Sequence, residues 1–236
     1  MTHASSILPL LLPGTERAPR LAGPMIASSL KPIVYTVGHS TRSLDEFVRL
    51  LRSFGIRRVV DVRTIPRSRH NPQFDGKTLA TALRNRRLGY RPMKGLGGLR
   101  HSRADSANLG WRNLSFRGFA DYMQTPAFAE ALEVLIALAT ERTTVIMCAE
   151  AVPWRCHRYL IADALVVRGF PVEHIMDPGV SRTHSLHPLA AVDEGLIRYP
   201  APPADEPAVD DDLVVYPLGS GVASTCQLDA IRERKS

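Results

Sequence analysis

Two thiols, a carboxylate, an imidazole and two guanidinium groups fall within the eleven residues from Cys148 to Arg158. Cys148 and Glu150 follow an apolar, β-branched run, and Pro153 precedes a helical pattern of apolar residues. We therefore expect a buried strand, a polar loop and a helix opened by Pro153, whose first turn holds residues 154–158. The unpaired N–H groups and the dipole of such a helix start favour an anion nearby.

The first candidate catalytic residues are Cys148 and Glu150. A thiol close to a cationic helix start is expected to have a lowered pKa and to attack as the thiolate. The alternative is that Cys148 is a small buried hydrophobic residue. Glu150 either caps the following helix or acts as a general base.

The remaining polar residues of this stretch also allow two interpretations each. Arg155 and Arg158, three residues apart on a helix, form either a clamp for an anion or a surface pair. His157, together with His39 from an earlier loop, is either an acid–base group or a structural residue. Trp154 either stacks on a nucleobase or packs in the core.

Cys148, Cys156 and His157 could in principle bind zinc. Their spacing matches no familiar zinc pattern, and adjacent residues on a helix point about 100° apart. The sequence therefore predicts no metal site, and it gives no indication of a cofactor.

The elements that position these residues form a βαβ unit near the start of the ordered chain. Residues 33–37 are typical of a buried strand, Ser43 and Glu46 form a capping box at a helix start, and residues 59–63 are typical of a second strand. This order predicts a single α/β domain with a mostly parallel sheet flanked by helices, a Rossmann-like three-layer arrangement.

Loops that follow parallel strands lie at one edge of the sheet and can line one pocket. The expected substrate-binding residues come from three such loops: Ser40, Asp61, Arg63, Arg69, Trp154, Arg155 and Arg158. Asp61 and Arg63 would point the same way from a strand, so they either pair with one another or face the crevice.

Charge is concentrated in one segment of the chain. Residues 57–117 hold fifteen lysines and arginines and three acidic residues, a net charge of +12. This segment predicts an anionic small molecule or a nucleic acid as partner, unless it reflects a generally basic composition. No apolar run is long enough to span a membrane. Three cysteines do not make a disulfide framework, so we expect a cytoplasmic protein.

The two ends of the chain differ from its centre. Residues 1–32 lack periodicity and predict a disordered extension, in which Met25 is a second possible start. Residues 201–236 are expected to form an acidic, disordered tail. The intervening residues, 33–200, then form the folded domain.

Several motifs together resemble one family, the domain of unknown function 488 family, over roughly residues 33–200. They are TVGHS (36–40), VDVRTIPRSR (60–69), GLGG (95–98), GFADYM (118–123) and MCAEAVPWRCHRYLIADAL (147–165). The resemblance implies a compact α/β domain of bacterial and archaeal cytoplasm but supplies no activity. The residues that match the motifs are His39, Ser40, Asp61, Arg63, Pro66, Arg69, Cys148, Glu150, Trp154, Arg155, Cys156, His157 and Arg158.

These observations lead to a primary hypothesis and two alternatives. The first is an enzyme acting on a phosphate-bearing substrate, a nucleotide or nucleic acid, with Cys148 as nucleophile and Glu150 or His39 moving a proton. The second is a non-catalytic nucleic-acid binding module that uses residues 57–117. The third is redox or metal sensing through Cys148 and Cys156.

Overall fold

The computed structural model of the 236-residue chain describes Met1 and residues 30–203. The fold below is that of the unit that begins at Lys31. The predicted N-terminal extension and acidic tail lie almost entirely outside the described residues, so their predicted disorder stays a prediction.

A six-stranded sheet forms the centre of this unit, and its strand order is β3-β2-β4-β1-β5-β6. The first five strands in this order pair in parallel, and β6 pairs antiparallel with β5. The expected mostly parallel α/β sheet is confirmed. The strands are β1 (Val34–Gly38), β2 (Arg58–Asp61), β3 (Gly89–Pro92), β4 (Thr144–Cys148), β5 (Val172–Asp177) and β6 (Val180–Thr183).

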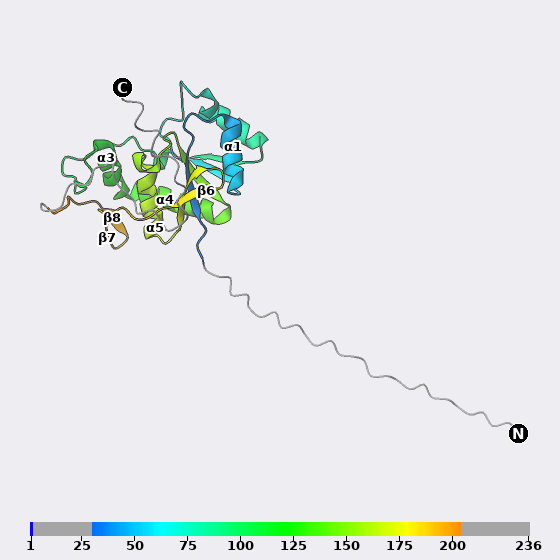
Figure 1. The fold of residues 1–236 in the computed structure, drawn as a ribbon. Coiled ribbons are helices and arrows are strands. Elements are labelled where there is room, and N and C mark those ends of the chain that lie inside the picture. The colour runs from blue at the N-terminus through cyan, green and yellow to red at the C-terminus, as the bar shows by residue number, and fades with distance from the viewer. Residues whose placement is uncertain (2–29, 204–236) are drawn as a thin grey trace, which may run out of the picture. The chain divides into compact units, whose positions relative to one another are not determined.

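Helices cover both faces of the sheet because its strands are apolar on both sides. In β4, Val145 and Met147 belong to one apolar cluster and Ile146 to the other. Two helices pack in the cluster of Val145, and three pack in the cluster of Ile146 (Figure 1). The first group is α1 (Leu44–Ser53) and α2 (Gly76–Asn85), and the second is α3 (Leu114–Met123), α4 (Pro126–Glu141) and α5 (Arg158–Val167).

Two helix starts follow the expected capping chemistry. The hydroxyl of Ser43 accepts from the amide of Glu46, and the carboxylate of Glu46 accepts from the amide of Ser43, which completes the capping box of α1. At α4, the hydroxyl of Thr125 accepts from the amide of Phe128, and Pro126 takes the first helical position.

The helix expected to open at Pro153 begins later than predicted. Pro153 opens only a single 3₁₀ turn, η3 (Pro153–Arg155). Cys156 is then extended, with φ −139° and ψ 140°, and α5 starts at Arg158 with His157 as its N-cap. A proline at a first helical position is equally compatible with one turn or with a long helix, so the local pattern could not distinguish them.

The chain after β5 contains strands that the sequence did not indicate. Strands β7 (Ala191–Asp193) and β8 (Leu196–Arg198) form a second, two-stranded sheet. A buried hydrogen-bond network joins this end of the chain to the main sheet. In it, the carboxylate of Asp163 contacts His184 at 2.8 Å and accepts from the Tyr199 hydroxyl at 2.7 Å, and His184 contacts His174 at 2.9 Å.

None of the helices in the described part of the chain has both the length and the apolar character needed to cross a bilayer.

Candidate functional site

Three neighbouring strands, β2, β4 and β1, end at the same edge of the sheet, since Gly38 pairs with Cys148 and Asp61 with Met147. A cleft of about 540 Å³ lies at this edge. Its walls come from the loops after β2 and β4, from the turn before α5 and from two further segments, residues 98–99 and 113–116. The lining residues are Arg63, Thr64, Ile65, Arg67, Gly98, Leu99, Asn113, Ser115, Phe116, Cys148, Ala149, Glu150, Arg155, Cys156 and His157.

In the loop that follows β4, the backbone carbonyl groups of residues 148–151 all accept hydrogen bonds. The carbonyls of Cys148 and Ala149 accept from the amides of His39 and Ser40. The next two carbonyls, of Glu150 and Ala151, accept from the guanidinium of Arg158 at 2.5 and 2.8 Å. Arg158 itself is 1% exposed, so its side chain is a structural brace for the loop and not part of an anion clamp.

The amides of the same loop point the other way. In a trans peptide the N–H is antiparallel to the C=O, so the amides of residues 149–151 point away from β1 and from Arg158. None of these three amides donates a hydrogen bond to another described group, whereas the amide of Val152 donates to the Glu150 carboxylate at 3.2 Å. Since Ala149 and Glu150 line the cleft, successive donors of this kind form a concavity suited to an anion.

Gly38 allows the loop to approach β1 this closely. A Cβ placed on Gly38 would lie 1.9 Å from the carbonyl oxygen of Glu150, which no side chain can occupy.

A buried charged cluster supports the floor of the cleft from behind. Arg63 binds both carboxylate oxygens of Asp61, at 2.9 and 2.7 Å, and also donates to the carbonyl of Phe74 and to Nε2 of His39. Asp61 also accepts from the hydroxyl of Tyr90 at 2.6 Å. Asp61 and Arg63 therefore pair with one another, and Arg63 also lines the cleft while Asp61 does not. Most N–H groups of the Arg63 guanidinium already donate to protein acceptors. Arg63 therefore contributes positive charge to the cleft but not a pair of N–H groups for a ligand.

The ionisation of this cluster follows from its burial. Burial raises the pKa of Tyr90, and the hydrogen bond to Asp61 acts in the same direction. Burial also lowers the pKa of His39 to about 4, and the charge of Arg63 adds to the shift. His39 stacks on Phe74 with ring centroids 4.1 Å apart and is 2% exposed, and it does not line the cleft. His39 is therefore a neutral structural histidine in this state.

The two cysteines of the central stretch lie together in the cleft, and neither forms a disulfide. The hydrogen bond to Cys156, together with burial, raises the pKa of Cys148. Burial alone would raise the pKa of Cys156, but the hydrogen bond from Cys148 and the charge of Arg158 outweigh it and lower this pKa. The expectation of a lowered pKa at Cys148 was wrong, because this thiol shares a hydrogen bond with Cys156 and is buried, and the charge of Arg158 lowers the pKa of Cys156 instead.

The structure brings only part of the predicted site together. Cys148, Glu150, His157, Arg63 and Arg155 line the cleft, and Glu150 and Arg155 are exposed there. Six predicted residues do not line it: His39, Ser40, Asp61, Arg69, Trp154 and Arg158.

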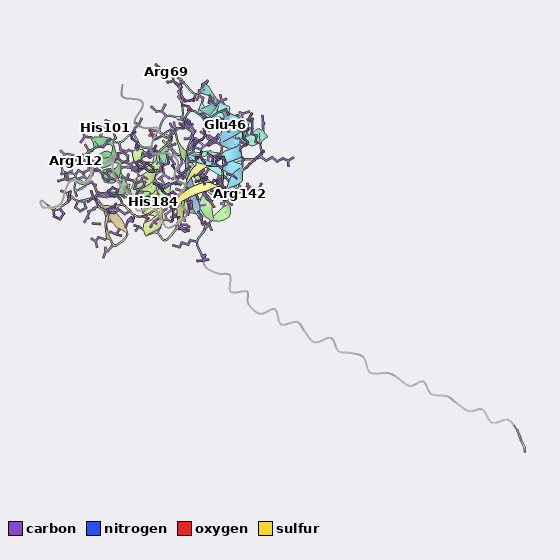
Figure 2. All side chains as sticks on the ribbon, in the orientation of Figure 1. Glu46, Arg69, His101, Arg112, Arg142 and His184 are labelled. Atoms are coloured by element: carbon purple, nitrogen blue, oxygen red, sulfur yellow. The ribbon has the colours of Figure 1, made fainter. Side chains whose placement is uncertain are left out.

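The reasons differ from residue to residue. Arg69 projects from the outer rim of the fold (Figure 2) and is exposed. Trp154 packs against the apolar cluster below α5, which agrees with its interpretation as a core residue. Ser40 contributes its backbone, donating to Ala149 and accepting from His39.

Several lining residues were not among the predicted site residues. Arg67 was counted only as part of the basic segment, although its place in the loop after β2 was a sufficient signal. Gly98 belongs to the GLGG motif, whose glycine-rich character pointed to close backbone approach. Asn113 and Ser115 lie at the start of α3 and carry no local signal that would assign them to this edge.

A second, basic groove of about 970 Å³ adjoins the cleft and shares Thr64, Ile65 and Arg67 with it. Four cationic residues and one acidic residue line the groove: Arg67, Lys77, Arg84, Lys94 and Asp75. Part of the +12 charge of residues 57–117 is thus gathered beside the candidate site.

A family model described as domain of unknown function DUF488 matches residues 43–165, which is more than half of the chain. Neither the curated proteins nor the solved structures contain a match.

Proposed function

The chain belongs to the family of the domain of unknown function DUF488, and from that premise we propose that it is an enzyme acting on a phosphate-bearing substrate, a nucleotide or a nucleic acid. The observation that carries the proposal is the loop after β4. There, the amides of residues 149–151 donate to no other described group, and two of these residues, Ala149 and Glu150, line a cleft that also holds a thiol and exposed guanidinium groups.

The amides supply hydrogen bonds to the phosphate oxygens, and two arginines supply the compensating charge. Arg67 and Arg155 are exposed and line the cleft, Arg67 from the loop after β2 and Arg155 from the turn η3 before α5. Hydrogen bonds from charged donors to phosphate are the strong ones. Arg155 is one of the arginines predicted from the sequence, and Arg67 takes the place of Arg69, which projects outward, and Arg158, which braces the loop.

The reacting groups are Cys148 and Glu150. Cys148 is the more exposed of the two thiols and stands at the start of the amide loop, so it is the candidate nucleophile. Because its pKa is raised, the thiol must give up its proton to a base in the step in which it attacks. Glu150 is exposed in the same loop and is the candidate proton carrier. The proposal places this chemistry in a reducing cytoplasm, where both thiols persist.

Binding of inorganic phosphate and of nucleoside phosphates, measured by calorimetry at fixed ionic strength, tests the anion site. Arg67→Gln and Arg155→Gln should each weaken binding by about 10–100-fold, the equivalent of one hydrogen bond to a charged group. Arg69→Gln is the matched control, because Arg69 is an equally exposed arginine outside the cleft, and it should leave affinity unchanged. Equal affinity in all three variants would refute the proposed anion site.

Turnover tests the chemistry. Once a nucleotide that binds has been found, Cys148→Ser and Glu150→Gln should each abolish or strongly reduce its conversion while retaining affinity. Wild-type turnover in both variants would remove the proposed roles.

The adjoining groove favours one alternative function, a non-catalytic nucleic-acid binding module. Lys77, Arg84 and Lys94 line the groove but not the cleft. Their joint replacement by Gln should flatten the salt dependence of oligonucleotide affinity by roughly 0.7–0.9 in log–log slope for each lost phosphate contact. If nucleic acid is bound only through the groove, phosphate affinity in the cleft and the Arg155→Gln effect will both be absent.

A further inference from the structure

Three potential metal ligands meet on the wall of the cleft. The Sγ atoms of Cys148 and Cys156 and a ring nitrogen of His157 all lie within 4.8 Å of one another. The Cys156 Sγ is 3.7 Å from Nδ1 of His157. Within residues 30–203 these three side chains form the one such group of histidine, cysteine and acidic residues.

The separations between these three ligand atoms are close to those expected around a bound zinc ion. Zinc binds sulfur at about 2.3 Å and nitrogen at about 2.0 Å in tetrahedral geometry, which places neighbouring S and N ligands about 3.6 Å apart and two S ligands about 3.8 Å apart. The observed S···N distance of 3.7 Å already matches. The remaining separations, all within 4.8 Å, need shifts of about 1 Å or less.

The tautomer of His157 also suits a ligand. Its Nε2 lies 3.2 Å from the carbonyl oxygen of Val62, which can only accept, so Nε2 carries the proton. The lone pair of Nδ1 is then directed toward the Cys156 sulfur. A metal-binding histidine usually donates its other ring N–H to such a carbonyl or carboxylate, which fixes the ring and the tautomer.

Gly98 packs against the ring of His157. A Cβ on Gly98 would lie 2.4 Å from Nδ1 and 2.6 Å from Cγ of His157, over the ring and not in the ring plane, where the lone pair of Nδ1 lies. A glycine at this position of the GLGG motif therefore lets the imidazole take the position in which its Nδ1 lies 3.7 Å from the Cys156 sulfur.

One of the two sequence arguments against a metal site assumed that Cys156 and His157 lie within an α-helix, which they do not. Adjacent residues on an α-helix diverge by about 100°, but Cys156 is extended and His157 only caps the helix that follows. The extended residue lets the two side chains converge, and β4 supplies Cys148 from the neighbouring strand end.

We propose that Cys148, Cys156 and His157 bind one thiophilic divalent cation of the Zn²⁺ class, with the fourth coordination position open to the cleft. Two thiolates balance the charge of the cation, and sulfur ligands select a soft or borderline metal in a region otherwise rich in arginine. Three protein ligands and an open position are typical of catalytic rather than structural zinc.

This inference goes beyond the proposed function and does not depend on it. A bound metal makes the sulfur of Cys148 a ligand, so metal binding and nucleophilic attack by this thiol are alternative uses of one atom. A protein that binds the cation but no phosphate would keep this inference and lose the proposed function.

The test is a titration of the full chain with Co²⁺ as spectroscopic probe, after chelator treatment and under reducing conditions. Cys226→Ser serves as the background, because it leaves Cys148 and Cys156 as the two remaining cysteines. We expect one Co²⁺ per chain, with thiolate-to-cobalt charge-transfer bands and tetrahedral ligand-field bands, and stoichiometric displacement by Zn²⁺.

Four variants locate the site. Cys148→Ser and His157→Gln should weaken Zn²⁺ binding by more than the 10–100-fold that loss of an outer-shell partner costs. Gly98→Ala should weaken it although all three ligand residues are retained, because the added Cβ displaces the ring of His157. Leu99→Ala, which changes an exposed neighbour in the same cleft wall, should not weaken it.

Two results would overturn the proposal. One is Co²⁺ binding without charge-transfer bands, and the other is equal affinity in the wild type, Cys148→Ser and His157→Gln. Urea unfolding of each variant in chelator shows whether a loss of binding comes from loss of the fold.

Discussion

Asp61→Asn is the sharpest test of how the edge of the sheet is held together. The substitution keeps the shape of the side chain but removes the charge that faces Arg63. Asp61 is 1% exposed and Arg63 6%, so the guanidinium would stay buried without its counter-ion. One of the two oxygens that accept from Arg63 and Tyr90 would also become an amide group facing donors.

The expected cost is about 3–5 kcal/mol of unfolding free energy, the range for breaking a buried ion pair by removing one partner. With a urea m-value of about 2 kcal/mol/M, the midpoint should fall by about 1.5–2.5 M. Asp105→Asn is the matched control, because Asp105 pairs with Arg103 at the same two-residue spacing but on the exposed surface. Its midpoint should not change measurably.

The double variant Asp61→Asn/Arg63→Met separates an unpaired charge from lost packing. It leaves no charge buried, so it should be more stable than Asp61→Asn alone. A midpoint for Asp61→Asn within error of the wild type, or a double variant that loses at least the sum of the two single effects, would refute the account of Asp61 and Arg63 as a mutually dependent buried pair.

Further predictions concern the loop after β4, the buried histidine and the helix cap. Gly38→Ala should cost about 1–3 kcal/mol of unfolding free energy and weaken ligand binding in the cleft, because its Cβ would lie 1.9 Å from the Glu150 carbonyl oxygen. Urea unfolding measures the stability and calorimetry the affinity. A variant with wild-type stability would contradict the close approach of the loop to Gly38. Stability should fall as the pH drops from about 6.5 to about 4, because in this range the unfolded chain takes up a proton at His39 and the folded protein, with its lowered pKa, does not. In His39→Gln the urea midpoint should therefore decline less steeply over the same pH range. An unchanged slope would argue against a buried neutral imidazole. Ser43→Ala should cost about 1 kcal/mol through loss of the capping box, whereas Ser53→Ala near the other end of the same helix should have a smaller effect; equal midpoints would contradict the cap.

Local patterns predicted the parts of the fold that local chemistry determines. The capping box at Ser43 and the proline at position 126 mark two helix starts correctly, and the apolar runs before His39 and Cys148 mark two central strands. The position of the loops after β1, β2 and β4 at one edge followed from the parallel order alone, but only the loops after β2 and β4 line the cleft.

The roles of individual polar residues could not be predicted in this way. Arg158 has the same side chain as Arg155, but it extends back to carbonyls seven and eight residues earlier, and only the folded loop brings them within reach. The buried network of His174, His184 and Asp163 likewise depends on strand pairing and on the path of the chain after β5. The residue type shows that a side chain can carry charge. Its contacts in the folded protein decide whether that charge is available to a ligand.

The fixed backbone of the loop after β4 has a consequence for how this edge could change its ligand. Four carbonyls of this loop accept hydrogen bonds and the loop packs directly against Gly38, so its backbone is held before any ligand binds, and a ligand that fits it should lose little affinity to reorganisation. Side chains on the rim, such as Arg67, Leu99 and Ser115, can then be exchanged without moving the donors beneath them. The edge is therefore a suitable starting scaffold for engineering selectivity, with the invariant contacts made by the main chain and the variable ones by the rim.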